Sequence, residues 1–305
     1  MSRSILITGG SGLIGRALRR ELADNNGRIT LISRKRMVPP VPREKLFFLR
    51  APSFPNKLLL PRDQYFDAVV HLAGENVAGG YWTPRRKERI RASRITGTRT
   101  LVEAIKSLEK KPKVLLCASA VGYYGDAGER ELTEASPRGT GFLAELCRDW
   151  EAEANRAAEL GIRVVNLRFG VVLSPRGGAL QKMLPAFRFG LGGPLGDGRQ
   201  FISWISLRDT VRAIAFLMTK PEIEGPVNLT APNPVRNNEL TRALAKALHR
   251  PAFLRVPAPI LRLLLGELAR EMLLCSQRVL PALLLKHHFS FQDPEILSAL
   301  QSCLK

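Results

Sequence analysis

Short apolar runs alternate with amphipathic helical patterns through the first two-thirds of the 305-residue chain. The runs are often β-branched and are Ile5–Ile7, Ile29–Ile32, Ala68–Leu72, Val114–Ala118 and Val164–Leu167. Helical spacing of apolar residues fills the intervals at 13–24, 84–109 and 141–160. Apolar strands that alternate with helices are typical of a sheet covered on both faces. The pattern therefore predicts an α/β fold, a Rossmann-type doubly wound parallel sheet.

The pattern changes after Leu167. The elements expected there are a helix near 179–189, a helix at 210–218 capped by Asp209, a last strand at 226–230 and a mostly helical stretch at 237–300. A further short strand is expected at Leu46–Leu49. Charged residues and a proline interrupt the apolar stretch 261–285, which favours paired core-facing helices over a membrane span.

Composition and cysteine usage are those of an ordinary soluble protein. Hydrophobic residues make up 45% and charged residues 24% of the chain. A strand begins within four residues of the start, which leaves no room for a signal peptide. The four cysteines are scattered without metal-ligand spacing, so we expect reduced thiols, no metal and a cytoplasmic location.

The formal net charge of +20 raises the question of a polyanionic partner. The basic residues are spread along the chain, without a basic tail, zinc-finger spacing or an aromatic RNA-binding motif. We therefore expect weak, salt-sensitive adhesion to polyanions but no specific nucleic acid partner, and we expect no membrane partner. The expected partner is a small-molecule substrate, and the oligomeric state stays open.

The glycine-rich stretch Thr8–Gly15 directly follows the first apolar run. Gly9 allows a tight turn, Gly12 lets the backbone approach phosphates, and Gly15 packs the following helix closely. Leu13 and Ile14 open that helix, whose first amide groups and dipole favour an anion. Strand, loop and helix together predict a dinucleotide site; the alternative is an ordinary glycine-rich turn.

The second strand ends at Ser33-Arg34-Lys35, roughly 20 residues beyond the glycine loop. An acidic residue there would bind the ribose of NAD, whereas arginine can hold the 2′-phosphate of NADP with paired bonds. Ser33 and Arg34 therefore favour NADP(H); the alternative is a solvated basic turn.

Two later strand ends add candidate residues at the same sheet edge. Leu72, Ala73 and Gly74 are small or apolar and would let the chain pass close to the adenosine half of the cofactor. His71 before them is more often a core histidine than a catalyst. Ser119 would lie near the nicotinamide and the substrate.

These blocks together resemble the extended short-chain dehydrogenase/reductases of the NAD(P)-dependent epimerase/dehydratase family, over nearly the whole chain. The subgroup that it looks closest to is the epimerase-like "cell division inhibitor" group, which carries an added C-terminal domain. The matching blocks include Thr8–Gly15, His71–Asn76, Ile90–Thr98, Ser119–Gly125, Trp150-Glu151, Leu167–Leu173, Leu191–Pro194 and Gln277–Pro281.

The resemblance implies two domains with a substrate cleft between them. Residues 1–171 plus 203–230 would form the NADP(H)-binding Rossmann domain, and 172–202 plus 231–305 a smaller, mostly helical C-terminal substrate-side domain. It also favours cofactor or substrate contacts for Arg94 and Arg168, each of which has a bland alternative as a structural ion pair.

One departure from the family matters for chemistry. Its dehydrogenases use a Tyr-x-x-x-Lys pair, in which the lysine lowers the pKa of the tyrosine from about 10 so that the phenol can transfer a proton. Here Phe142 or Leu143 takes the tyrosine place and Leu146 or Cys147 the lysine place. The standard proton transfer is therefore not available from these positions.

Replacement acids are available nearby. Tyr123 and Tyr124 follow Ser119 and could project into the cleft, and Glu145, Cys147 and Arg148 lie on the next helix. Two functions stay open. One is an NADPH-dependent oxidoreductase, with Ser119 orienting the substrate oxygen and Tyr123 or Tyr124 as proton donor. The other is a non-catalytic NADP(H)-binding sensor or scaffold. A third possibility, a nucleotide-sugar epimerase, would rely on the absent tyrosine.

Overall fold

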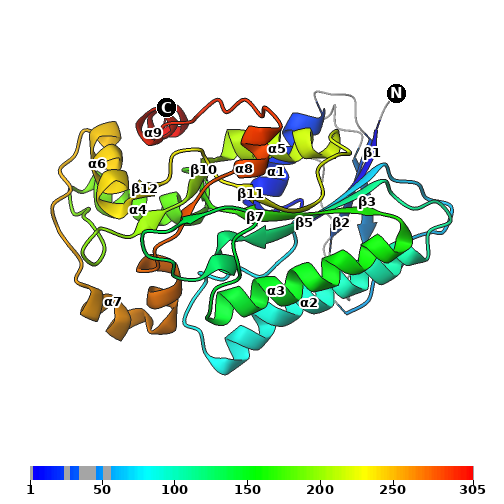
Figure 1. Ribbon diagram of the computed structural model, residues 1–305, viewed down its shortest axis with the longest axis horizontal. Coiled ribbons are helices and arrows are strands. Elements are labelled where there is room, and N and C mark those ends of the chain that lie inside the picture. The colour runs from blue at the N-terminus through cyan, green and yellow to red at the C-terminus, as the bar shows by residue number, and fades with distance from the viewer. Residues whose placement is uncertain (1–2, 24–27, 34–45, 51–55, 305) are drawn as a thin grey trace.

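Seven parallel strands form the central sheet of the computed structural model, which describes residues 3–23, 28–33, 46–50 and 56–304. The strand order is β3-β2-β1-β4-β5-β7-β11, so the chain winds outward in both directions from β1 and β4 (Figure 1). The strands are β1 (Ser4–Thr8), β2 (Arg28–Ser33), β3 (Leu46–Arg50), β4 (Ala68–His71), β5 (Val114–Ala120), β7 (Arg163–Phe169) and β11 (Gly225–Leu229). The predicted Rossmann-type doubly wound sheet is confirmed.

Helices cover both faces of this sheet. On one face lie α1 (Leu13–Ala23) and α5 (Leu207–Met218), and on the other lie α2 (Pro84–Lys106) and α3 (Phe142–Asn155). Side chains alternate between the two faces, so Ile5 and Ile7 join the core under α1 and α5 while Leu6 joins the core under α2 and α3. This two-sided burial explains why the strands are apolar at successive positions.

Helix starts follow the expected capping chemistry, with one correction. Thr83 caps α2, where its hydroxyl accepts from the Arg86 amide and Pro84 occupies the first turn. The cap of α5 is Ser206, whose Oγ accepts from the amide of Asp209 at 3.1 Å. The prediction that Asp209 caps this helix is therefore wrong, because a serine three residues earlier makes the cap.

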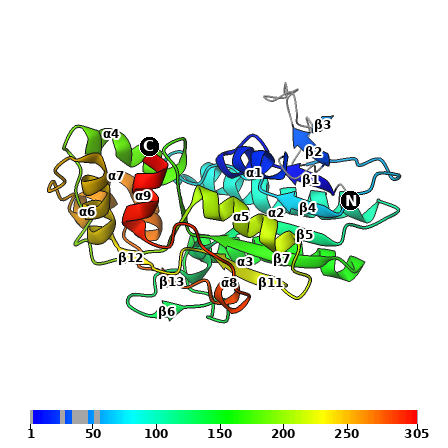
Figure 2. The same ribbon diagram turned by 90° about the horizontal axis from the view of Figure 1, so that it is seen from above.

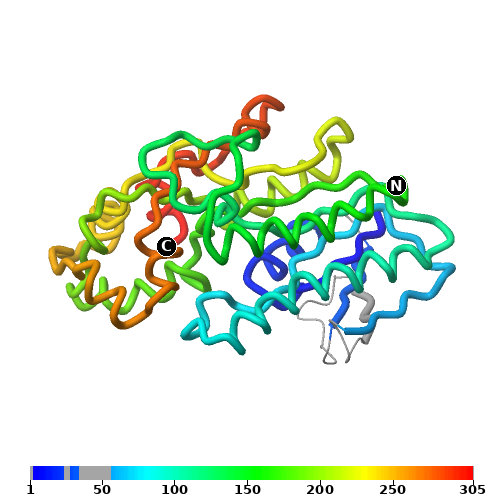
Figure 3. The backbone as a smooth tube through the Cα atoms, turned by 60° about the horizontal axis from the view of Figure 1, so that its bottom comes forward, coloured from blue at the N-terminus to red at the C-terminus, as the bar shows by residue number. Residues whose placement is uncertain are grey.

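Most of the C-terminal part gathers at one end of the sheet, whereas α8 (Ala282–Lys286) lies beside β11 (Figures 2 and 3). Its other helices are α4 (Gly178–Arg188), α6 (Asn237–Leu248), α7 (Ala258–Leu265), the π-helical turn η3 (Ala269–Leu273) and α9 (Ile296–Leu304). Three pairs of short strands accompany these helices: β8 (Val171–Leu173) with β10 (Trp204–Ser206), β9 (Phe201–Ile202) with β12 (Val235–Arg236), and β6 (Glu131–Leu132) with β13 (Arg278–Val279). Short 3₁₀ turns lie at η1 (Val121–Tyr124) and η2 (Arg156–Leu160).

A separate apolar cluster around the buried Trp204 holds α4, α6 and α9 together. The chain does not stay in this cluster, because Leu284 of α8 and Phe289 pack into the core of the sheet. The predicted domain boundaries stay a prediction, and residues 282–291 tie the C-terminal part back to the sheet.

The stretch 261–285 differs from its prediction. It contains α7, η3, β13 and the start of α8, but α7 buries Leu261 and leaves Leu263 and Leu264 exposed. Periodic apolar residues predicted the helix correctly, but not that one of its faces is uncovered. No helix among the described residues is long and apolar enough to cross a membrane.

Candidate functional site

A pocket of about 1070 Å³ opens at the carboxyl ends of β1, β2 and β4. Ligands of doubly wound sheets bind at this edge, outside the carboxyl ends of the strands. Six of the predicted cofactor residues line it, namely Gly9, Gly12, Ser33, Leu72, Ala73 and Gly74. The structure thus brings the glycine loop and both strand ends into one cleft, which we call the dinucleotide cleft.

Each glycine of the loop has a distinct physical reason. Gly9 has a φ of 72°, and a Cβ there would lie 2.6 Å from the backbone of Leu72. A Cβ on Gly15 would lie 2.3 Å from the carbonyl oxygen of Gly9, so only glycine lets α1 pack this closely. A Cβ on Gly12 would meet only that same oxygen, at 3.3 Å. Packing within the loop therefore does not require glycine here, and the missing side chain leaves space for a ligand outside the loop.

The start of α1 supplies hydrogen-bond donors toward this space. Leu13 and Ile14 belong to the first turn, whose amides have no acceptor four residues earlier within the helix. A Cβ on Gly177 would lie 3.2 Å from Cδ1 of Leu13. The Leu13 side chain therefore packs against the loop before α4. Backbone donors, glycine space and the helix dipole fit a pyrophosphate.

The ribose end of the cleft contains Ser33, the last residue of β2. Arg34 lies outside the described residues, so the contact predicted for it stays a prediction. On the opposite wall, Glu75 accepts from Arg86 at 2.7 Å and lies 3.7 Å from Arg89. These two arginines compensate the carboxylate of Glu75, the one acidic side chain among the described residues that line the cleft.

His71 has a structural role, as expected for a histidine of the core. Its ring nitrogens contact the hydroxyls of Thr8 at 2.5 Å and Thr98 at 3.0 Å, and Trp150 donates to Thr98 at 2.9 Å. Complete burial and the nearby Arg94 lower the pKa of His71 to about 3. The neutral imidazole therefore joins β1, β4 and α2 rather than transferring protons.

Arg94 of α2 lies below the dinucleotide cleft. A Cβ on Gly74 would lie 3.2 Å from its guanidinium carbon, which also stacks 5.0 Å from the ring of Trp150. Burial lowers the pKa of Arg94 to about 10. Its hydrogen bonds to Ile90 O and Ser93 Oγ are long, at 3.4 and 3.3 Å. Contact with the cofactor stays a prediction.

Ser119 and Arg168 meet in a buried polar cluster instead of facing an open cleft. Ser119 Oγ donates to Glu151 Oε1 at 2.6 Å. Arg168 forms a bidentate pair with the same carboxylate, with both N–O distances at 2.8 Å. The Ser119 hydroxyl thus donates its hydrogen bond within the protein, and its predicted role of orienting a substrate oxygen stays a prediction. Arg168 does not line the dinucleotide cleft, and its predicted cofactor contact has no support from this geometry.

The two tyrosines separate clearly. Tyr124 is 2% exposed, donates to Asn228 Oδ1 at 2.7 Å and accepts from Arg168 at 2.9 Å. Because Tyr124 is buried, it does not project into a cleft as a proton donor, and burial also raises its pKa to about 12. Tyr123 is half-buried with its ring 3.5 Å from the Arg168 guanidinium carbon. Within the described part of the chain its hydroxyl has no hydrogen-bond partner.

Apolar side chains and a thiol occupy the positions, in the first two turns of α3, where the resemblance places the Tyr-x-x-x-Lys pair. Leu143 fills the space beside Gly122, and Cys147 Sγ lies 3.7 Å from the carbonyl oxygen of Ala120. Burial raises the pKa of Cys147 to about 11, so the thiol stays protonated at neutral pH. Glu145 and Arg148 form surface ion pairs, with Arg91 and Asp149 respectively.

Three functional contacts were missed by sequence reasoning. Glu271 of η3 accepts from the amides of Phe142 at 2.9 Å and Leu143 at 2.8 Å, so a distant carboxylate caps α3. Glu151 stood in a family block without a role, yet it organises the buried cluster. Thr8 joins His71 to the Ala73 amide. Only the fold brings these partners together.

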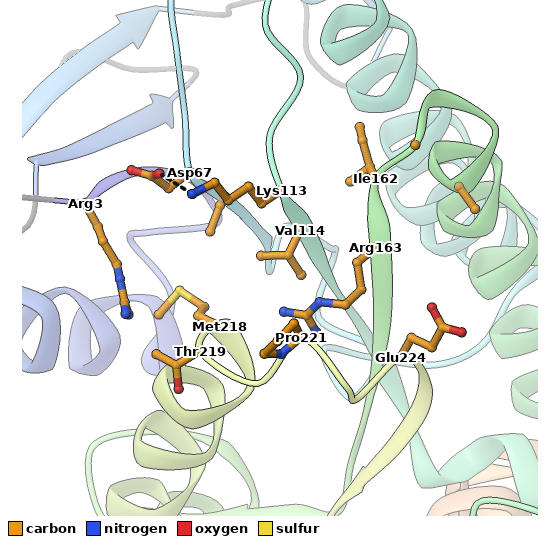
Figure 4. A pocket seen from close by; sticks show the side chains of 13 residues that line it. Arg3, Asp67, Lys113, Val114, Ile162, Arg163, Met218, Thr219, Pro221 and Glu224 are labelled. Atoms are coloured by element: carbon orange, nitrogen blue, oxygen red, sulfur yellow. Dashed lines mark ion pairs between the residues drawn. The ribbon is translucent and has the colours of Figure 1, made fainter.

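A second pocket, of about 670 Å³, opens at the opposite edge of the sheet (Figure 4). Arg163 there donates to the carbonyls of Ile223 at 2.6 Å and Leu217 at 3.0 Å, and Lys113 lies 3.8 Å from Asp67. These side chains close the amino ends of the strands and the end of α5. The edge lacks the glycine loop, so we assign the dinucleotide to the other pocket.

Comparison with known proteins agrees with this geometry. Residues 5–229 match the NAD dependent epimerase/dehydratase family, and residues 256–303 match a domain of unknown function, DUF1731. Epimerase family protein Mb2239 of Mycobacterium bovis is 43% identical over 97% of this chain and 96% of its own. The chloroplastic SDR39U1 homologue of Arabidopsis thaliana is 38% identical over 99% of this chain and 87% of its own.

A solved structure extends the similarity to three dimensions. Human epimerase family protein SDR39U1 (isoform 2), crystallised with NADPH, superposes with a TM-score of 0.88 at 32% identity. The match covers 98% of each chain. The similarity therefore includes the C-terminal part as well as the sheet.

Proposed function

Because this chain belongs to the NAD-dependent epimerase/dehydratase family, we propose that it binds NADP(H) in the dinucleotide cleft and reduces a small carbonyl or imine substrate. The observation that carries the proposal is the glycine loop, whose backbone space and first-turn amides fit a pyrophosphate. The human relative at 32% identity, crystallised with NADPH, supports the choice of cofactor.

The chain's own residues divide the binding work. Gly12, Leu13 and Ile14 present the backbone that would hold the pyrophosphate, with the helix dipole behind them. Ser33 and Arg34 would hold the 2′-phosphate, for which arginine offers paired charge-assisted bonds. Leu72–Gly74, which follow β4 and line the cleft, would contact the adenosine half. When bound, the cofactor supplies the hydride.

Reduction of a carbonyl also needs a proton at the oxygen, and Tyr123 is the candidate donor. Its hydroxyl is free of protein partners among the described residues, whereas those of Ser119 and Tyr124 are used internally. Glu151 fixes the guanidinium of Arg168, and the Tyr123 ring stacks on that guanidinium. In this proposal Ser119 and Tyr124 are positioning residues.

The same proposal includes two finer statements. The chain falls in the "cell division inhibitor"-like subgroup, which the C-terminal domain of unknown function supports. It acts in the cytoplasm, which reduced cysteines favour: Cys117, Cys147, Cys275 and Cys303 form no disulfide.

A second candidate function is a non-catalytic NADP(H)-binding sensor or scaffold. The specific observation in its favour is that Phe142 or Leu143, and Leu146 or Cys147, stand where the family has its proton-transfer pair. Both functions share the cofactor, so a binding test comes first and a turnover test second.

Calorimetric titration with NADPH and NADH tests the shared step. We expect tighter binding of NADPH, and we expect Arg34→Glu to remove that preference while NADH binding persists. Equal affinities in the unchanged protein would refute the assignment of the 2′-phosphate.

Loss of NADPH absorbance with a panel of carbonyl substrates then separates the two functions. In the oxidoreductase, Tyr123→Phe lowers kcat and leaves the NADPH affinity unchanged. A catalytic rate that Tyr123→Phe leaves intact would overturn the role of this hydroxyl, and NADPH binding without turnover would favour the sensor.

A further inference from the structure

An uncovered apolar surface lies at the end of the molecule farthest from β1–β3, where α4 and α7 meet the loop before α7 (Figures 1 and 2). Seven large apolar side chains are exposed there: Phe189, Leu191, Phe253, Leu254, Ile260, Leu263 and Leu264. Clusters of exposed apolar side chains of this size mark interaction sites more often than chance. We call residues 185–191 and 250–264 together the apolar-basic surface.

The two segments of this surface are adjacent in space as well as similar in character. The amide of Leu254 donates to the carbonyl of Gly192 at 3.1 Å, and a Cβ on Gly190 would lie 3.3 Å from Pro251. Ile260, Leu263 and Leu264 follow at helical spacing, which places them on one face of α7. The exposed side chains at 189–191 and 253–254 therefore lie side by side, and those of α7 follow them within ten residues of the chain.

Arginines are the only charged residues in both segments. They are Arg188, Arg250, Arg255 and Arg262, and neither segment contains an aspartate or a glutamate. None of the four forms an ion pair with a described residue. The acidic residues within seven positions of these segments are Asp197, Glu267 and Glu271. Asp197 accepts from the amide of Arg199, Glu267 pairs with Lys87, and Glu271 caps α3. The surface thus offers apolar contact and uncompensated positive charge together.

This combination selects the occupant. A second copy of the chain would bring arginines against arginines across a two-fold axis, which is unfavourable. Nucleic acid would supply the negative charge and could stack bases on Phe189 and Phe253, but the other five exposed apolar side chains are aliphatic and offer bases neither stacking nor hydrogen bonds. Leucine and phenylalanine in the acyl boundary with arginine at the headgroups is the arrangement of proteins that lie on anionic bilayers.

We infer that the apolar-basic surface docks the protein on an anionic lipid membrane, without spanning it. The inference is independent of the cofactor and replaces the expectation that the protein has no membrane partner. Phe253 and Leu263 are 73% and 86% exposed, so they can enter the acyl boundary without unfolding of the chain. Arg255 and Arg262, beside them in sequence, would contact the lipid phosphates.

Flotation of the full-length protein with vesicles tests the inference. We expect binding to vesicles of equimolar phosphatidylcholine and phosphatidylglycerol, little binding to phosphatidylcholine alone, and weakening as salt is raised. Phe253→Ser and Leu263→Ser should each lower the partition coefficient about tenfold. Arg255→Gln and Arg262→Gln should each lower it about fivefold.

Matched controls come from the far side of the molecule. Leu59 is 76% exposed outside the surface, so Leu59→Ser should leave binding unchanged. Arg20→Gln and Lys106→Gln remove equal charge from exposed positions on α1 and α2 and should also have little effect. Thermal unfolding midpoints of all variants verify that the fold is intact.

Several outcomes overturn the inference. One is the absence of binding to anionic vesicles at low salt. Another is equal loss of binding in the control charge variants, which would indicate diffuse adhesion of a basic protein. A concentration-dependent dimer that Leu263→Ser dissociates would instead assign the surface to a second copy. Equal binding to single-stranded DNA, lost in the same variants, would assign it to nucleic acid.

Discussion

Replacement of Glu151 by glutamine tests whether the buried polar cluster is held by one carboxylate. Glu151 is 7% and Arg168 3% exposed, and the two form a bidentate pair with both distances at 2.8 Å. Glutamine keeps the shape but removes the negative charge. It also turns an amide N–H₂ group toward either the guanidinium or the Ser119 hydroxyl, which both need an acceptor.

The magnitude follows from the geometry. Two charge centres about 4 Å apart attract with about 4 kcal/mol at an effective dielectric constant of about 20. Desolvation of both charges offsets much of this attraction in the intact pair, but the glutamine variant keeps the desolvated arginine without its partner. Removal of one partner from a buried pair costs about 3–5 kcal/mol, and we expect Glu151→Gln to lower the free energy of unfolding by that amount.

Urea unfolding followed by circular dichroism measures this change. The control is Glu153→Gln, two residues along the same helix, whose partners Arg99 and Arg156 are half exposed. Solvent screens that network, so the control should lose no more than about 1 kcal/mol. A double variant Glu151→Leu with Arg168→Met removes both buried charges and should recover most of the stability that Glu151→Gln loses.

Equal destabilisation by Glu151→Gln and Glu153→Gln would refute the reasoning, because it would mean that water screens both pairs alike. A double variant less stable than Glu151→Gln would refute it differently. That result would show that the cluster contributes through packing or hydrogen bonds rather than through charge compensation.

Three further predictions concern the loop, the imidazole and the cap. Gly15→Ala should abolish NADPH binding and destabilise the fold, since its Cβ would lie 2.3 Å from a loop carbonyl, whereas Gly12→Ala should stay folded and lose at least tenfold in NADPH affinity by titration. His71 has its pKa lowered to about 3 in the folded state, so only the unfolded state binds its proton between pH 6.5 and 3; this residue should therefore cost about 1.4 kcal/mol of stability per pH unit below 6.5, and His71→Gln should flatten that slope in pH-dependent urea melts. Glu271→Gln weakens the carboxylate cap of α3 and should lower the unfolding free energy by about 1 kcal/mol, and an unchanged urea midpoint would contradict the cap.

Local pattern was sufficient for the sheet and for the glycine loop. The interior positions of the strands that start at Ser4 and Ala68 are apolar and buried on both faces, so these elements can be predicted without knowledge of their partners. The loop was readable because Gly9 and Gly15 are constrained by atoms within their own strand–loop–helix unit or at the neighbouring strand end. The Asp209 cap failed because Ser206 offered a competing cap in the same turn.

Long-range pairing explains what sequence reasoning missed at the site. Ser119 was expected to face the substrate because it lies at the end of a strand. Its hydroxyl instead donates a hydrogen bond to Glu151, 32 residues later in the chain. Tyr123 and Tyr124 are neighbours with the same side chain, and only the hydrogen bonds to Arg168 and Asn228 distinguish the hydroxyl of Tyr124 from that of Tyr123. The uncovered face of α7 has the same periodicity as a covered one, so periodicity could not reveal it.

The cap of α3 by Glu271 also constrains the order in which the protein can be completed during synthesis. The start of α3 leaves the ribosome 129 residues before the carboxylate that caps it. Asp209 likewise waits for the amides of Gln292 and Asp293, which it accepts at 2.8–3.0 Å. Domains generally fold as units while they emerge, so the nucleotide-binding half lacks these contacts until residues 271–293 have been synthesised. A nascent chain stalled before residue 271 should therefore be protease-sensitive at the start of α3.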